Sequence, residues 1–204
     1  MAKVTAAFLG LGASGTLGNT LTASTWKGIP VMKLKPTPTN PKSDGQVGHR
    51  TLFSCAAAIG RTLTTPQQAL WQATIAGMAQ TWFNAIISMA SKNWKKGLGP
   101  QMLPTRVDDT APGPPTALEA TLHGSTVRLT WTAPADADKE CYLIFRSPTT
   151  GVSDVESELK GFTLTPTIQF DDLPGSGTWY YTAVCVDVDG NKSTIATETS
   201  IVVP

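Results

Sequence analysis

Acidic side chains are almost missing from the first half of this chain. Residues 1–107 contain eleven lysines and arginines but a single acid, Asp44, which gives a formal charge of +10. Residues 108–204 contain five lysines and arginines and fourteen acids, which gives −9, so the 204-residue chain has a net charge of only +1. Opposite charges in the two halves predict different partners for each half.

Cysteines and long apolar runs are also scarce. The three cysteines are an odd number without C-x-x-C spacing, which argues against a disulfide framework or a zinc site. No stretch approaches the length of about 18 apolar residues that a membrane helix needs. The opening residues MAKVTAAFLG hold one lysine and a short apolar run, a weak signal peptide at best. We therefore expect synthesis in the cytoplasm and no membrane partner.

Catalytic groups are few and separated. The two histidines, His49 and His123, fall in different halves of the chain. The motifs of serine hydrolases, zinc proteases and lysine-containing phosphate loops are absent from the sequence. We therefore predict that the chain is not an enzyme, that it has no catalytic residues and that it uses no cofactor.

One glycine pattern imitates a nucleotide site. Residues Gly10–Gly15 spell G-x-G-x-x-G, which binds dinucleotides when a helix follows it directly. Here Gly18, Gly28 and Pro30 follow, and they disfavour a helix. The acid that should hold the ribose is also missing at the required spacing. The pattern instead predicts glycine-rich turns between short strands.

Two acidic clusters offer oxygen ligands for a cation, at residues 136–140 and 187–191. The second cluster begins like a calcium loop but lacks the glutamate that such a loop requires. Aspartate, asparagine and glycine are also the residues that favour turns. We predict turns at both places and no metal site.

A proline-rich segment divides the chain. Four prolines and a glycine lie between Pro104 and Pro115, and they disfavour both helix and strand. We therefore predict a multidomain α+β protein with a basic N-terminal anchoring domain over residues 1–102, a linker over 103–115 and an all-β sandwich over 116–204.

The basic half is predicted to contain a β-hairpin and two helices. Strands are expected at Thr20–Ser24 and Ile29–Leu34, followed by an extended segment to Pro41. A first helix should run from Ser43 or Asp44 to about Ile59 with Gly60 as its stop, and a second from Thr65–Pro66 to Gly97. The second helix carries one apolar stripe, which we expect to form the core of this domain: Trp71, Ile75, Met78, Trp82, Ile86 and Met89.

The acidic half shows the alternation typical of strands, with turns between them. Six strands over about 90 residues predict two packed sheets, at residues 118–122, 127–131, 141–146, 167–170, 179–188 and 200–203.

This half resembles a fibronectin type III domain over residues 111–204. The resemblance rests on Pro112 with Pro115, Leu129–Trp131, Tyr142 with Arg146, Leu173–Gly175 and Asp187–Ser193. It implies a sandwich core built on Trp131, Tyr142, Trp179 and Tyr181. The sequence departs from the family where the corner tyrosine is usual, because Trp179 stands there. Either the indole takes over that role, or Tyr180 or Tyr181 does.

Residues 4–95 resemble short phage and prophage proteins. The shared stretches are Ser14–Gly18, Trp26–Pro30, Thr39–Ser43, Gln46, Arg50, Leu63–Thr64, Trp71 and Phe83–Asn84. The resemblance implies a virion-associated role and supplies no active site.

These observations predict a structural protein of a tailed bacteriophage virion. The N-terminal half would dock on an acidic lattice or ring of other virion proteins in the capsid, neck or tail, through Trp26, Lys27, Lys33, Lys35, Lys42 and Arg50. The sandwich would project outward, with self-association and weak contact with host-surface glycans as further possibilities. Two alternatives remain open: a phage accessory protein that binds DNA through the basic half, and a secreted carbohydrate-binding module.

Overall fold

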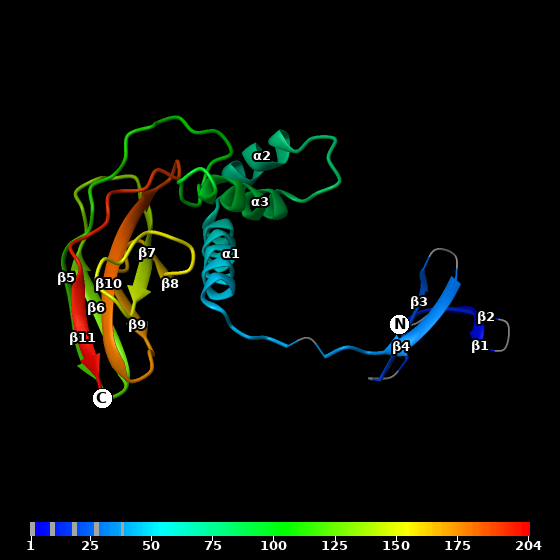
Figure 1. Cartoon of the computed structure of the whole chain (residues 1–204). Helices are drawn as coiled ribbons and strands as arrows, with labels where there is room; N and C mark the ends of the chain where they lie inside the picture. Colours follow the sequence, from blue (N-terminus) through cyan, green and yellow to red (C-terminus); the bar gives the residue numbers. More distant parts are fainter. Residues whose placement is uncertain (1–2, 9–10, 18–19, 27–28, 38) are drawn as a thin grey trace. The chain divides into compact units, whose positions relative to one another are not determined.

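The chain divides into two compact units, which we describe separately (Figure 1). The computed structural model describes residues 3–8, 11–17, 20–26, 29–37 and 39–204. We call residues 1–41 the N-terminal sheet and residues 42–204 the body.

The N-terminal sheet is a four-stranded antiparallel meander with the strands in sequence order. Its strands are β1 (Lys3–Phe8), β2 (Leu11–Leu17), β3 (Leu21–Trp26) and β4 (Ile29–Leu34). The two expected strands correspond to β3 and β4. Leu11–Leu17 form a strand where a dinucleotide site needs a helix, so Gly12 and Gly15 of the glycine pattern lie in a β-strand, while Gly10 falls outside the described residues.

The acidic half forms a sandwich of two antiparallel sheets, as its alternating pattern predicted. One sheet has the order β5-β6-β9 and the other the order β11-β10-β7-β8. The strands are β5 (Thr116–His123), β6 (Thr126–Thr132), β7 (Lys139–Ser147), β8 (Leu159–Leu164), β9 (Gln169–Asp172), β10 (Gly177–Asp187) and β11 (Thr199–Val203). Strand β8 was not predicted, because Gly161 interrupts its alternation.

The expected core residues lie between these two sheets. Trp131, Tyr142 and Tyr181 are buried there, and the half-buried Trp179 packs against them. The Trp179 indole Nε1 donates a hydrogen bond of 2.7 Å to the carbonyl oxygen of Gly175, four residues upstream. Trp179 therefore makes the backward hydrogen bond that a corner tyrosine normally makes. Tyr181 fills the core, and its hydroxyl donates to Asp172 Oδ2 at 2.8 Å.

Three helices are present in the described part of the body: α1 (Asp44–Thr62), α2 (Thr65–Thr74) and α3 (Trp82–Trp94). The start of α1 agrees with the prediction, but Gly60 does not end it. Gly60 is buried, and a Cβ there would lie only 3.0 Å from the Phe83 ring. Its role is close packing between α1 and α3.

The single second helix expected over residues 65–97 is wrong. The chain leaves helical geometry after Thr74 and turns at Gly77, where φ is +80°. Met78, which the stripe placed in the core, is 60% exposed in that turn. The rest of the stripe still packs as expected, because Trp71, Ile75 and Ile86 share one buried cluster.

Helix α1 covers the outer face of the larger sheet. Leu52, Cys55 and Ile59 share a core with side chains of β7, β8 and β10. Strand β7 is therefore buried on both faces, with six consecutive buried residues from Glu140 to Phe145. The helices and the two sheets form three layers with a core between each pair of neighbouring layers, and a further cluster lies among the helices, which makes a mixed α+β body (Figure 1).

The compact units thus differ from the expected domains. Residues 103–115 form neither helix nor strand and β5 begins at Thr116, but the division between units falls at Pro41/Lys42. The physical reason is the second apolar face of the larger sheet. It can be buried only by a further layer, and the helices supply that layer.

Candidate docking surfaces

The β3–β4 pair of the N-terminal sheet gathers apolar residues on one face. Residues directly opposite each other on antiparallel strands share a face. Leu21 pairs with Leu34 and Ala23 with Met32, which places four apolar residues on one face. Lys33 pairs with Thr22 and Val31 with Ser24, so the other face is mixed polar and apolar.

Met32 and Leu34 are 38% and 76% exposed, so the apolar face is incompletely covered by the described residues of its own unit. Lys33 and Lys35 are exposed as well. Of the other residues expected in docking, Lys27 lies outside the described residues, and the Trp26 side chain does too.

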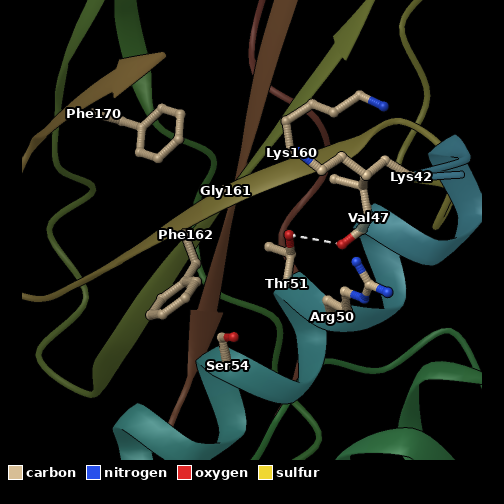
Figure 2. Close-up of a pocket in the computed structure, with 9 residues that line it drawn as sticks. All are labelled: Lys42, Val47, Arg50, Thr51, Ser54, Lys160, Gly161, Phe162 and Phe170. Atoms are coloured by element: carbon tan, nitrogen blue, oxygen red, sulfur yellow. Dashed lines mark hydrogen bonds between the residues drawn. The ribbon is translucent and has the colours of Figure 1, made fainter. Parts of the chain in front are cut away.

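Lys42 and Arg50, the last two expected docking residues, line a groove of about 460 Å³ in the body. Figure 2 shows it between α1 on one side and β8 on the other. Helix α1 contributes Val47, Thr51 and Ser54, and the sheet side contributes Lys160, Gly161, Phe162 and Phe170.

Two phenylalanines form the apolar wall of the groove, and each closes one of the cores. Phe162 packs against the core under α1, and Phe170 packs against the sandwich core. The Phe170 ring lies against Gly161, where a Cβ would be 2.0 Å from it. Glycine is required there because the ring occupies the space of a side chain.

Basic side chains line the groove. Lys160 Nζ lies 2.7 Å from Asp44 Oδ1, and this contact lowers the pKa of Asp44. Lys42 and Arg50 are the other basic residues of the lining, although the body as a whole has twelve lysines and arginines against fifteen acids.

The acidic cluster at residues 187–191 is a turn, as predicted, and it binds protein groups. Asp187 Oδ1 accepts hydrogen bonds from the backbone N–H groups of Asp189 and Asn191, at 2.9 and 2.8 Å. Asp189 accepts from the backbone of Val107 and Asp108, at 3.1 and 3.0 Å. Burial raises the pKa of Asp187, while the bonds from Asn191 oppose this shift.

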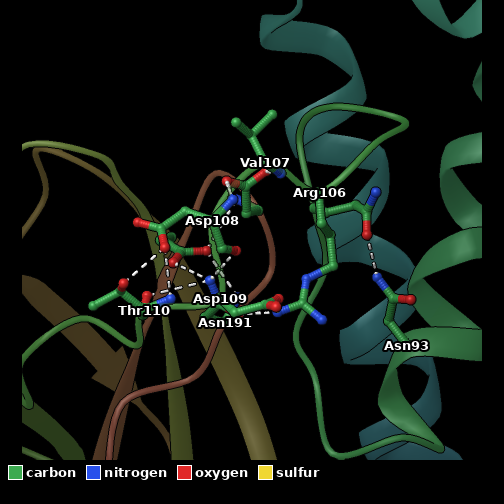
Figure 3. A network of polar contacts seen from close by, with 10 residues as sticks. Asn93, Arg106, Val107, Asp108, Asp109, Thr110 and Asn191 are labelled. Atoms are coloured by element: carbon green, nitrogen blue, oxygen red, sulfur yellow. Dashed lines mark hydrogen bonds and ion pairs between the residues drawn. The ribbon is translucent and has the colours of Figure 1, made fainter.

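This turn fastens the expected linker to the sandwich (Figure 3). Asn191 Nδ2 donates to the carbonyl oxygens of Asp108 and Thr110, at 3.0 and 3.2 Å. Arg106 forms an ion pair of 2.8 Å with Asp109 and also contacts Asn191. The carboxylate oxygens are engaged by backbone donors, which is a structural role.

The described residues contain neither a metal-binding cluster nor a membrane-spanning helix. Among them, no group of three or more histidine, cysteine, aspartate or glutamate side chains is arranged to hold a metal ion. Within the same ranges, no helix is both long and apolar enough to cross a membrane.

The architecture defines a class of protein: a fibronectin type III-like sandwich with helices packed on one sheet. The chain belongs to the DUF6266 family, a family of unknown function whose model matches residues 12–135. That match includes β2–β4, the three helices and the first two strands of the sandwich. No curated protein sequence matches the chain.

Several solved structures share similarity with part of the chain. A fibronectin type III-like protein from Clostridium thermocellum is 24% identical over 47% of this chain and 96% of its own, with a TM-score of 0.35. The spore cortex lytic enzyme SleM of Clostridium perfringens is 19% identical over 45% of this chain, which covers 28% of SleM, with a TM-score of 0.36. A β-1,2-glucanase from Parabacteroides distasonis is 18% identical over 50% of this chain and 14% of its own, with a TM-score of 0.40.

The sequence pointed to Lys42 and Arg50 but missed the sheet side of the groove. Lys160, Gly161 and Phe162 belong to the strand that was not predicted, and they lie more than 100 residues from Arg50 in sequence. Leu159, Phe162 and Leu164 were the available apolar signal, but their spacing of three and then two residues around Gly161 does not give the period of two that marks a strand.

Proposed function

We propose that this chain is a non-enzymatic structural protein of a tailed bacteriophage virion. In this proposal the N-terminal sheet docks on another particle protein in the capsid, neck or tail, and the body displays its fibronectin-like sandwich on the particle. The resemblance of residues 4–95 to phage and prophage proteins supplies the context.

The incompletely covered N-terminal sheet carries the proposal. An amphipathic sheet normally buries its apolar face against another layer, and small isolated sheets are marginally stable in water. Met32 and Leu34 remain exposed on that face. Docking on a partner protein would supply the missing layer. The apolar face of the N-terminal sheet would then be buried on the particle.

Charge favours an acidic partner surface. Residues 1–41 contain four lysines and no acid. Lys33 and Lys35 are exposed at the β4 edge of the described sheet, so their long side chains can reach acids at the rim of a partner that covers the apolar face. Complementary charge steers association and excludes basic partners. The proline-rich residues 36–41 form no described helix or strand, which suits a connecting arm between a docked sheet and the body.

The test is the amount of this chain in density-banded phage particles, quantified by mass spectrometry against the major capsid protein. We expect a fixed stoichiometry for the natural sequence. The double variant K33E/K35E should lower the copy number roughly five- to thirty-fold, because each reversal costs about 0.5–1 kcal/mol at an exposed contact.

The matched control is K95E/K96E, which reverses two exposed lysines of the body beyond α3 and should leave the copy number unchanged. Absence of the natural chain from washed particles would contradict the virion role. Equal occupancy by K33E/K35E would contradict docking through the N-terminal sheet.

A further inference from the structure

The segment that was expected to be a linker presents an apolar side chain on a fixed backbone. We infer that Val107 inserts into the pocket between α2 and α3 of a second copy of this chain, and that Asp108 beside it faces Lys92 of that copy. We call residues 106–110 the knob. This inference goes beyond the proposed function, because it assigns a contact between copies in which the N-terminal sheet takes no part.

Val107 has the properties of an interface anchor. It is 84% exposed, the highest value among the large apolar residues that the structure describes. Its backbone N–H and that of Asp108 donate to Asp189, at 3.1 and 3.0 Å. Asn191 holds the knob from the other side through two backbone carbonyl oxygens, and in Figure 3 the Val107 side chain points away from these bonds. A knob that is already ordered loses little entropy on binding.

The pocket between α2 and α3 is of a suitable size for this anchor. Its volume is about 150 Å³, and a space of that size holds a group about as large as benzene. Trp71 and Ile75 of α2 and Ala85 of α3 line it, and all three belong to one buried cluster. Met78, 60% exposed in the turn after α2, also lines the pocket. Methionine side chains adapt their shape to a partner, so one aliphatic side chain can be enclosed here.

The charges of the knob and the pocket are complementary. Residues 63–105, which include α2 and α3, contain three lysines and no acid. Lys92 lines the pocket, and no carboxylate of the described residues forms an ion pair with it. In the knob, Arg106 is paired with Asp109 at 2.8 Å, so Asp108 gives the knob its net negative charge. Opposite charges steer such surfaces together.

A second copy of the chain is the occupant that these observations favour. Each chain carries both the knob and the pocket, and Val107 is not part of the pocket lining in its own chain. The N-terminal sheet of another copy fits less well, because residues 1–41 contain four lysines and no acid and would be repelled. A nucleic acid also fits less well, because the pocket floor is apolar and offers one cation.

The contact joins two different surfaces. It is therefore heterologous, and repetition of it builds a ring or an open chain of copies. Copies that are held side by side on a larger particle can make such a contact even when it is weak in solution.

The first test is sedimentation velocity of the full chain over a range of concentrations up to about 1 mM. We expect the sedimentation coefficient to rise with concentration. Val107→Ser should weaken this self-association about ten-fold, because one aliphatic side chain is no longer buried. Its unfolding midpoint should stay unchanged, since the side chain is exposed in the single chain.

Two charge variants separate the pocket from the N-terminal sheet. K92E should weaken self-association at least about two-fold, as expected for an exposed ion pair. K33E/K35E is the control, because it reverses two exposed lysines of the other unit and should associate as the natural chain does.

Crosslinking with a short bismaleimide tests which residues meet. A mixture of the Val107→Cys and Met78→Cys variants should yield a crosslinked heterodimer, identified by mass. The native cysteines are buried and should not react. Leu70→Cys replaces Met78→Cys in the control mixture, because Leu70 is 53% exposed but does not line the pocket.

Three results would overturn the inference: no concentration dependence up to about 1 mM, equal self-association of Val107→Ser and the natural chain, or equal crosslinking of Val107→Cys to Met78→Cys and to Leu70→Cys. Each would leave the virion proposal standing, because that proposal is tested through Lys33 and Lys35 on the particle.

Discussion

At the scale of single residues, two buried carboxyl groups behave differently. Asp187 accepts backbone hydrogen bonds that oppose the effect of burial, although its pKa is still raised. Glu140, at the start of β7, is 7% exposed, and burial raises its pKa from 4.5 to about 7. The raised pKa means that the folded state holds the Glu140 proton more tightly than the unfolded chain does.

Glu140 therefore makes stability depend on pH. Below about 4.5 the carboxyl is protonated in both states, and its neutral form is tolerated. As the pH rises from 4.5 to 7 the unfolded state gains the charge first, so the free energy of unfolding falls, by an amount on the order of 3 kcal/mol.

Urea titrations at several pH values measure this dependence. Glu140→Gln should flatten the curve between pH 4.5 and 7, whereas Glu119→Gln at an exposed site of β5 should leave its slope intact. The same slope in Glu140→Gln would assign the effect to another group.

At the scale of elements, α1 contains glycines that allow close packing and do not end the helix. Its start follows from Ser43 and Asp44, which the sequence identified. Its glycines serve packing: Gly48 lies where a Cβ would be 1.7 Å from the carbonyl oxygen of Glu156, and Gly60 lies against Phe83. Gly45, in the same helix, has open space around it.

The two glycines of α1 give a matched pair of substitutions. Gly48→Ala should lower the free energy of unfolding by about 1–3 kcal/mol, because the new methyl group forces the helix away from the backbone of Glu156. Gly45→Ala should raise it, by up to about 1 kcal/mol, because alanine favours the helix. Chemical denaturation of both variants measures the difference. A stabilising Gly48→Ala would mean that α1 does not pack closely on residue 156.

Elements were predictable where local chemistry decides them. The capping box of α2, in which Thr64 pairs with Gln67 and Pro66 follows, places its start within one residue of the expected one. The break after Thr74 was not predictable from periodicity, because the stripe continues through Met78 into α3. Residues 75–81, with a left-handed Gly77 among them, separate the two helices.

At the scale of the whole molecule, the body joins helices and sandwich through a shared core. Cys55 of α1 and Cys141 of β7 place their sulfur atoms 3.7 Å apart, fully buried. Leu52, also in α1, is 1% exposed in the same cluster. The helices and the sandwich should therefore unfold together.

Leu52→Ala tests this cooperativity. We expect a loss of about 2–5 kcal/mol in the free energy of unfolding, as for large-to-small changes in a core. Hydrogen exchange should accelerate together in α1 and in β10. Phe53→Ala is the control, since Phe53 is 51% exposed and its loss should cost far less. Faster exchange in α1 with unchanged β10 would show that the two parts are independently stable.

The sequence by itself determined the starts of α1 and α2, six of the sandwich strands and the core tryptophan and tyrosines, because caps, turns and alternation are local. The charge asymmetry was equally readable. Tertiary structure alone decided that α1 covers the larger sheet and that the units divide at Pro41. It also decided that Arg50 and Lys160 line the same groove. These features depend on which apolar faces bury each other, and a periodic pattern shows that a face is apolar without showing what covers it.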